Sequence, residues 1–316
     1  MPTKNIQRFI LLAQITLVFI FLVIIAGSVV RATGSGMGCP DWPKCFGKWI
    51  PPTDASQLPE NYKEIYAGEH HAVAEFNALN TWTEYLNRLA GAILGVLIFI
   101  QLLVSIRIKK YDKRIFILSL LSFFLIGFQG WLGAKVVSSN LAPLKITIHM
   151  VMALVILSFA VAIIYRAKKL LDPAKEISVQ PRIIQVAALV LLMTIIQIML
   201  GTQVREEVDV LMKNFDAAFR GDIIENLGIT FNVHRTFSIL IMWMNFYLVF
   251  KIIKTCTDTS LKNMGKILAT ILIIEFLVGV ILNRFALPAA LQPVHLLLAC
   301  MTYALQFAII LKVLKK

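Results

Sequence analysis

The sequence predicts an all-α integral membrane protein with eight transmembrane helices arranged as two tandem four-helix bundles. Hydrophobic residues make up 58% of the 316 positions and charged residues only 16%, and the mean hydropathy is +0.77. A soluble globular domain carries about a quarter charged residues, so this composition excludes that class. The apolar residues also gather in runs of membrane-spanning length, and the sequence contains an internal repeat.

The apolar segments are each about twenty residues long, enough for a helix to cross roughly 30 Å of hydrocarbon. The first follows Lys4 and Arg8, is too long for the core of a signal peptide and has no small-residue cleavage site at its end. It is therefore predicted to remain in the protein as a helix. The expected segments are 9–30, 81–105, 115–135, 144–165, 183–204, 229–250, 267–283 and 291–312.

The distribution of basic residues predicts the orientation. The segments "RIKKYDKR" (107–114) and "RAKKLLDPAKEISVQPR" (166–182) each hold five basic residues, and "KIIKTCTDTSLKNMGK" (251–266) holds four. These loops and both termini are expected in the cytoplasm, and the loops 32–80 and 206–228 outside, with the protein in the cytoplasmic (inner) membrane. The net charge of +13 comes from such loop clusters, which argues against binding to nucleic acid.

Two segments far apart in the sequence mark the start of the repeat. "GSVVR" at Gly27–Arg31 matches "GTQVR" at Gly201–Arg205, an offset of 174 residues, whereas later matches are offset by 147 or 146. The first copy therefore has about 27 extra residues in its first outer loop. The predicted domains are 1–170, with the long outer loop, and 171–316.

The repeat also relates glycines and histidines. Gly133 stands sixteen residues before His149, and Gly279 stands sixteen before His295. Together with His234, these histidines fall in the first two turns of even-numbered helices. An imidazole in a bilayer is rare without a partner. A hydrogen bond between helices is one reading; the other is that His234 and His295 supply axial nitrogens to a haem in the core of one bundle. A zinc site is less favoured, because no further His, Cys, Asp or Glu nearby would complete the four ligands that zinc needs.

The openings of the second and sixth helices can be aligned. "TEYLNRLAG" from Thr83 and "TFNVHRTFS" from Thr230 place Arg88 on Arg235 and Asn87 on His234. Both arginines suit haem propionates, or they extend to lipid headgroups.

With these motifs, the sequence resembles the haem A synthases of cytochrome oxidase assembly. The resemblance covers nearly the whole chain: two four-helix halves, "GSVVRATGSGMGCPDWPKC" after the first helix, a Glu-x-x-His-Arg type motif opening the second, and histidines opening helices four, six and eight. It implies that the C-terminal half binds a haem b cofactor. It also implies that the N-terminal half holds haem O, whose C8 methyl group is oxidised to the formyl group of haem A.

The resemblance assigns roles to individual residues. His234 and His295 correspond to the cofactor ligands, His149 to a ligand on the substrate side, and Glu84 to the functional carboxylate. A carboxylate at that depth could take a proton or stabilise positive charge on an oxidised haem methyl; its simpler reading is an acidic residue near a helix start. Haem O synthase and an electron acceptor are expected partners.

Asn87 departs from the family pattern, which has histidine three residues after the glutamate. An amide is a very poor iron ligand beside imidazole, so the first half is not expected to form a bis-histidine site from these helices. The interpretation favoured here is that the second half stores electrons and the first handles substrate. Two alternatives remain: Asn87 only bonds to a neighbouring helix, or the chain has lost activity.

Four further polar residues and two cysteines are less informative. Cys39 and Cys45 flank "PDWPK" on the oxidising side, where a local disulfide is predicted. The histidines at 70 and 71 in the same loop are expected to be solvated, or to contact haem or metal transiently. Gln129 and Glu275 occupy matching repeat positions without an assigned role.

Two functional classes remain open. The first is an enzyme that oxidises a haem substituent, and the alternative is a membrane di-haem cytochrome b that relays electrons without substrate oxidation. The missing histidine favours the enzyme, because a relay benefits from two saturated sites. A transporter is disfavoured because the helices have few central Gly or Pro interruptions.

Overall fold

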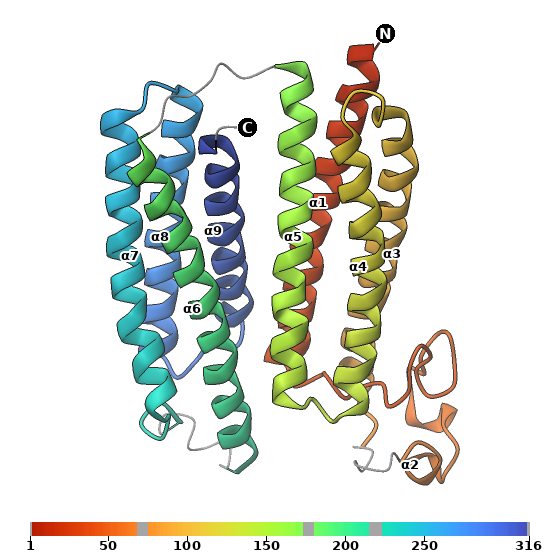
Figure 1. Ribbon diagram of the computed structural model, residues 1–316. Helices are drawn as coiled ribbons and strands as arrows, with labels where there is room; N and C mark the ends of the chain where they lie inside the picture. The colour runs from red at the N-terminus through yellow and green to blue at the C-terminus, as the bar shows by residue number, and fades with distance from the viewer. Residues whose placement is uncertain (1, 68–74, 173–179, 215–222, 315–316) are drawn as a thin grey trace. The chain divides into compact units, whose positions relative to one another are not determined.

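The computed structural model describes residues 2–67, 75–172, 180–214 and 223–314 (Figure 1). Within these residues the chain is helical apart from its connections, and the one extended pairing is an isolated bridge between Cys45 and Lys48. The elements are α1 (Pro2–Ala32), η1 (Ala55–Gln57), α2 (Tyr62–Ile65), α3 (Ala78–Ile108), α4 (Lys113–Ser138), α5 (Pro143–Leu171), α6 (Pro181–Asn214), α7 (Ile229–Thr255), α8 (Thr259–Arg284) and α9 (Leu291–Val313).

Eight of these helices are long and apolar enough to cross a membrane, as the sequence predicted. Six of them exceed the predicted segments at both ends, and α7 and α9 begin at the predicted residue and extend only at the C-terminal end. The seventh span, expected at 267–283, begins at Thr259 and ends at Arg284. The extra turns carry polar residues. A helix can continue beyond the hydrocarbon because its backbone hydrogen bonds are made within the helix. An even number of spans returns the chain to the side on which it entered.

The chain divides into two compact units. One is Leu12–Ile156, and the other combines the residues up to Leu11 with Leu157–Lys316. This division falls within α5, whereas the sequence suggested a boundary after residue 170. In the second unit, α6, α7, α8 and α9 pack on one another in order and α9 packs back on α6, which closes a four-helix bundle.

The core of this bundle is largely apolar and includes a few polar contacts between helices. Leu248, Ile252 and Leu268 are fully buried at the contacts between helices. Among them, Gln306 on α9 donates its Nε2 to Oδ1 of Asn245 on α7 at 2.8 Å. A side-chain hydrogen bond of this kind joins two membrane-spanning helices.

The starts of several helices are set by capping side chains. Asn77 caps α3, where its Oδ1 accepts the N–H of Asn80, and Asp258 caps α8 by accepting the N–H of Leu261. Asp258 also pairs with Lys312 near the end of α9 at 3.0 Å. Burial would raise the pKa of Asp258, but the Leu261 amide and the Lys312 ammonium hold the pKa below its usual value.

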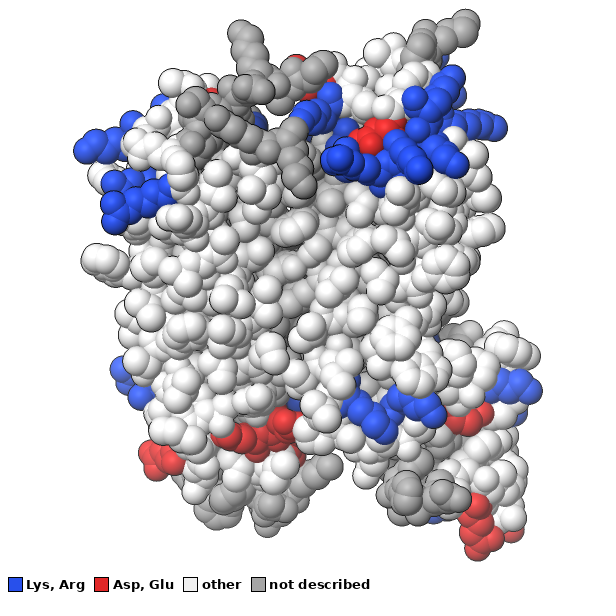
Figure 2. All heavy atoms as spheres, viewed as in Figure 1, with Lys and Arg blue, Asp and Glu red and all other residues white. Residues whose placement is uncertain are grey.

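Within each set of four helices, charge is confined to the helix ends. Figure 2 shows a broad uncharged band in each set. In the set with α3 and α4, lysines and arginines gather at the end that carries the α3–α4 connection, and in the set with α7 and α8 they gather at the end that carries the α7–α8 connection; most of the acidic residues of each set lie at its other end. Lys109 and Lys110 lie at the first of these connections and Lys254 at the second. This separation is the pattern expected of a membrane protein with basic cytoplasmic loops.

Candidate functional site

In the second unit, two histidines face glycines of neighbouring helices. A Cβ atom added to Gly201 on α6 would lie 3.2 Å from Cε1 of His234 on α7, and one added to Gly279 on α8 would lie 3.4 Å from Cε1 of His295 on α9. The absence of a side chain at each glycine therefore makes room for the ring. His234 and His295 lie on α7 and α9, two helices of the same four-helix bundle.

The first unit repeats this arrangement with one substitution. A Cβ atom added to Gly133 on α4 would lie 3.5 Å from Cε1 of His149 on α5. The equivalent glycine on α1, Gly27, faces Oδ1 of Asn87 on α3, at 3.7 Å from the added Cβ. Asn87 therefore occupies the place that a histidine has in the other three helix pairs, with the matching glycine retained.

The ring nitrogens fit a haem ligand role. Nδ1 of His149, His234 and His295 is in each case buried, with no hydrogen-bond partner among the described residues. A buried polar atom without a partner is costly, so three such rings favour a role for the imidazoles beyond packing. The described residues contain no group of three or more His, Cys, Asp or Glu side chains for a bare ion. A haem needs only axial ligands from the protein, so histidines placed singly or in pairs fit a haem.

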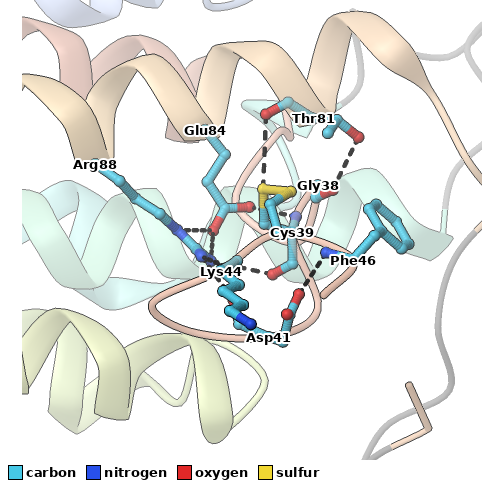
Figure 3. A network of polar contacts seen from close by, with 9 residues as sticks. Gly38, Cys39, Asp41, Lys44, Phe46, Thr81, Glu84 and Arg88 are labelled. Atoms are coloured by element: carbon cyan, nitrogen blue, oxygen red, sulfur yellow. Dashed lines mark hydrogen bonds and ion pairs between the residues drawn. A yellow bond between two sulfur atoms is a disulfide. The ribbon is translucent and has the colours of Figure 1, made fainter. Parts of the chain in front are cut away.

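Glu84 and Arg88 form a buried ion pair on α3 (Figure 3). Oε1 of Glu84 accepts from both Nε and Nη2 of Arg88, and Oε2 accepts the backbone N–H of Cys39 at 2.9 Å. The side chain of Glu84 is only 4% exposed. The carboxylate thus joins the helix to the disulfide loop, which is defined here as residues 38–47.

Arg88 donates to three carbonyl oxygens of the same loop. Nη1 reaches the carbonyls of Asp41 at 2.6 Å and Lys44 at 3.0 Å, and Nη2 reaches the carbonyl of Cys39 at 3.1 Å. With the two bonds to Glu84, all five N–H groups of the guanidinium are used. The expectation that Arg88 binds a propionate of the substrate stays a prediction. To bind a propionate, the guanidinium would have to give up hydrogen bonds to the loop carbonyls.

The predicted disulfide between Cys39 and Cys45 is present. Inside the ring that it closes, Asp41 accepts the N–H of Phe46 at 2.6 Å and the N–H of Gly47 at 2.9 Å. Both of these residues have positive φ, at 52° and 71°, a conformation that glycine adopts easily and phenylalanine rarely. The Asp41 carboxylate therefore stabilises a turn that the sequence alone would not favour.

Aromatic side chains give the loop between α1 and α3 a small core of its own. The ring of Phe46 makes edge contacts with Tyr62, Tyr66 and Phe76, with centroids 5.6–6.0 Å apart. Burial raises the pKa of Tyr66, and the negative charge of Asp41 raises it further. The loop is thus a folded element rather than a simple connection.

This element docks closely on the start of α3. A Cβ atom on Gly38 would lie 2.5 Å from the carbonyl oxygen of Asn80, so only glycine fits there. Thr81 donates its hydroxyl to the carbonyl of Gly38 at 2.9 Å, and Trp82 donates Nε1 to the carbonyl of Pro52 at 3.2 Å. The loop and the first two turns of α3 form one rigid surface.

Arg235, which aligns with Arg88, has different surroundings. It donates to Oδ1 of Asn232 at 3.1 Å, and its guanidinium lies 5.6 Å from the ring centroid of Phe231. Phe231 stands where the first half has Glu84. Arg235 is exposed, so its guanidinium is accessible to an anionic group in a way that the guanidinium of Arg88 is not.

Sequence reasoning missed one polar residue and left two without a role. Gln129 and Gln197 each donate Nε2 to the carbonyl oxygen of a histidine, at 3.0 Å. Glu275 accepts the hydroxyl of Thr302 at 2.8 Å. The available signal was position, because each of the three lies four residues before a glycine of the repeat. The histidines at 70 and 71 lie outside the described residues.

The fold and the site together define a class: a polytopic membrane protein built from a tandem repeat, with histidines that pack on glycines at matching positions of the repeat. The sequence model of one protein family, COX15-CtaA, described as "Cytochrome oxidase assembly protein", matches residues 10–307, and the chain belongs to that family.

Individual relatives agree with this assignment. The chain is similar to a protein named "Heme A synthase" from Flavobacterium johnsoniae, with 26% identity over 91% of this chain and 94% of that protein. A "Heme A synthase" from Shewanella oneidensis is 31% identical over 60% of this chain and 54% of that protein. One from Flavobacterium psychrophilum is 25% identical over 90% and 94%.

Proposed function

We propose that the chain is a haem A synthase, a membrane oxidoreductase that converts the C8 methyl group of haem O to the formyl group of haem A for assembly of a terminal oxidase. The name of its relatives supports this activity. The observation that carries the proposal is structural: His149, His234 and His295 each pack on a glycine at the same place in the repeat. Because the three histidines have equivalent surroundings, a shared role as ligands explains them better than three unrelated packing arrangements.

In this proposal the C-terminal half holds haem b as the cofactor. His234 and His295 would be its axial ligands, and the exposed guanidinium of Arg235 would pair with a propionate. When bound, the haem supplies one-electron transfer. The protein's part is to hold two imidazoles in a closed four-helix bundle and to keep one arginine at the edge of the site.

The N-terminal half would bind haem O as substrate. His149 provides the one strong ligand there, because the amide of Asn87 is a poor ligand for iron. Glu84 would serve the methyl group that is oxidised, by taking a proton or by stabilising positive charge. A singly held haem leaves more readily than one held by two histidines, which suits an enzyme whose product must reach another protein.

The orientation is part of the proposal. We place both termini and the basic α3–α4 and α7–α8 connections in the cytoplasm, and the disulfide loop outside, where thiols oxidise. Haem O synthase would deliver the substrate, and a separate acceptor would take the electrons. Reporter fusions at Lys110 and Ser56 should give opposite signals, and equal signals would contradict this topology.

The decisive experiment identifies the haems. The protein is purified from cells that make haem O, its haems are extracted, and each is identified by mass. We expect haem b together with haem O or haem A, and conversion of added haem O to haem A. Haem b alone, in both halves and without conversion, would overturn the proposal and favour an electron relay.

A further inference from the structure

Two glutamines contact two histidines in the same way. Gln129 on α4 donates Nε2 to the carbonyl oxygen of His149 on α5, and Gln197 on α6 donates Nε2 to the carbonyl oxygen of His234 on α7. Both distances are 3.0 Å. In each case the glycine that faces the histidine ring lies four residues later on the glutamine's helix. Two adjacent turns of one helix therefore contact the backbone and the ring of a single histidine.

These contacts are not needed to satisfy the backbone. A helical carbonyl already accepts an N–H from the following turn, and the glutamine uses its second lone pair. Meanwhile Oε1 of both Gln129 and Gln197 is buried without a partner among the described residues. An apolar side chain would avoid that desolvation cost. Packing between helices therefore does not explain an amide at both positions. Positioning of the histidine through its carbonyl oxygen does explain it.

The two other helix pairs lack this contact. Glu275 stands four residues before Gly279, but its side chain bonds to the hydroxyl of Thr302 instead of the carbonyl oxygen of His295. Four residues before Gly27 the chain has Val23. The glutamine contact therefore occurs at one histidine in each four-helix half.

We infer that Gln129 and Gln197 are positioning residues for the haem ligands His149 and His234. By bonding to the histidine's own carbonyl, each glutamine sets the height and the rotation of the ligand helix against its neighbour, and so the direction in which the imidazole meets iron. Preorganised ligands bind more tightly because they lose less freedom on binding. This inference rests on the proposed haem sites, but not on the oxidation reaction.

The test replaces each glutamine by leucine and measures haem release. Purified holoprotein is mixed with an excess of haem-free myoglobin, and the transfer of each haem is followed by absorbance. Gln197→Leu should release haem b about tenfold faster and alter its low-spin resonance spectrum, with haem O binding unchanged. Gln129→Leu should weaken haem O binding by a similar factor and leave haem b unchanged.

A matched control separates positioning from packing. Gln306→Leu removes another buried amide in the second unit, one that bonds to Asn245, and it should release haem b at the wild-type rate. Gln197→Met, unbranched and of similar length, replaces the leucine variant if that variant does not fold. If the wild type holds both haems and the Gln129 and Gln197 variants match Gln306→Leu, the inference is wrong and the proposed function stands. A wild type that binds no haem would refute both.

Discussion

The backbone N–H of Cys39 donates to Oε2 of Glu84 at 2.9 Å, so a carboxylate within the second membrane-spanning helix is hydrogen-bonded to the backbone of a disulfide-bonded cysteine. Arg88 strengthens this link, since its guanidinium joins the same carboxylate to three loop carbonyls. A change at Glu84 therefore acts on the loop as well as on whatever the carboxylate contacts in a haem site. The two effects need separate measurements.

Glu84→Gln should loosen the disulfide loop. The substitution keeps the shape but removes the charge, and a hydrogen bond to a charged group contributes about 1.5–3 kcal/mol. We expect reduction of the Cys39–Cys45 disulfide by a water-soluble phosphine to become roughly tenfold faster, as measured by alkylation and mass spectrometry. Glu75→Gln is the control, because Glu75 makes only an exposed ion pair with Lys63 in the described residues. Equal reduction rates for Glu84→Gln and the wild type would show that the ion pair does not hold the loop.

The two aligned arginines should have opposite effects. Arg88→Ala is expected to free the disulfide loop and leave haem b in place, because all five N–H groups of Arg88 point to the loop and Glu84. Arg235→Ala should weaken haem b binding by roughly tenfold, through loss of one charge-assisted bond, and leave the loop closed. Haem titration and the disulfide reduction assay report the two outcomes. A loss of haem b in the Arg88→Ala variant would contradict the assignment of Arg88 to the disulfide loop.

The membrane fold was predictable from the sequence because span length and loop charge are local properties. The disulfide was predictable too, since Cys39 and Cys45 are close in sequence in a loop that the charge distribution predicted to be on the oxidising side. The partners of Arg88 were not, because they depend on how the loop folds back over α3, which no periodicity records. One signal did exist: the loop after the first helix of the first half is about 27 residues longer than its counterpart in the second half, and only the first half has a carboxylate at the position of Glu84, where the second half has Phe231.

Asp258→Ala should lower the free energy of unfolding by about 1 kcal/mol at neutral pH, since it removes a helix cap and the ion pair with Lys312. The pKa of Asp258 is lowered in the folded protein, so its stabilisation is present above the unfolded pKa of about 3.9 and is lost as the pH falls through the folded pKa. Thermal denaturation in detergent should therefore show a wild-type advantage at pH near 7 that shrinks below about pH 4. Lys312→Met should cost less, because the cap remains. A pH-independent difference would mean that the carboxylate charge contributes nothing.

The Asn87→His substitution should give the first half a second strong ligand. The position can accept an imidazole, because Gly27 faces it just as glycines face the three histidines, and an added Cβ on Gly27 would lie 3.7 Å from the present Oδ1. A haem held there by two histidines should show a second low-spin resonance spectrum. We also expect the product to leave about tenfold more slowly, which corresponds to about 1.4 kcal/mol of added binding.

His149→Ala and Asn87→Leu complete the set. His149→Ala should lose haem O while retaining the haem b of the second half, and Asn87→Leu should convert haem O with little change, because neither an amide nor an alkyl group binds iron well. Haem content by mass and the rate of haem O to haem A conversion are measured for all three variants. If Asn87→His adds no low-spin spectrum and His149→Ala converts haem O as the wild type does, the substrate haem does not bind between these helices. The first half would then act only as the support of the external loop.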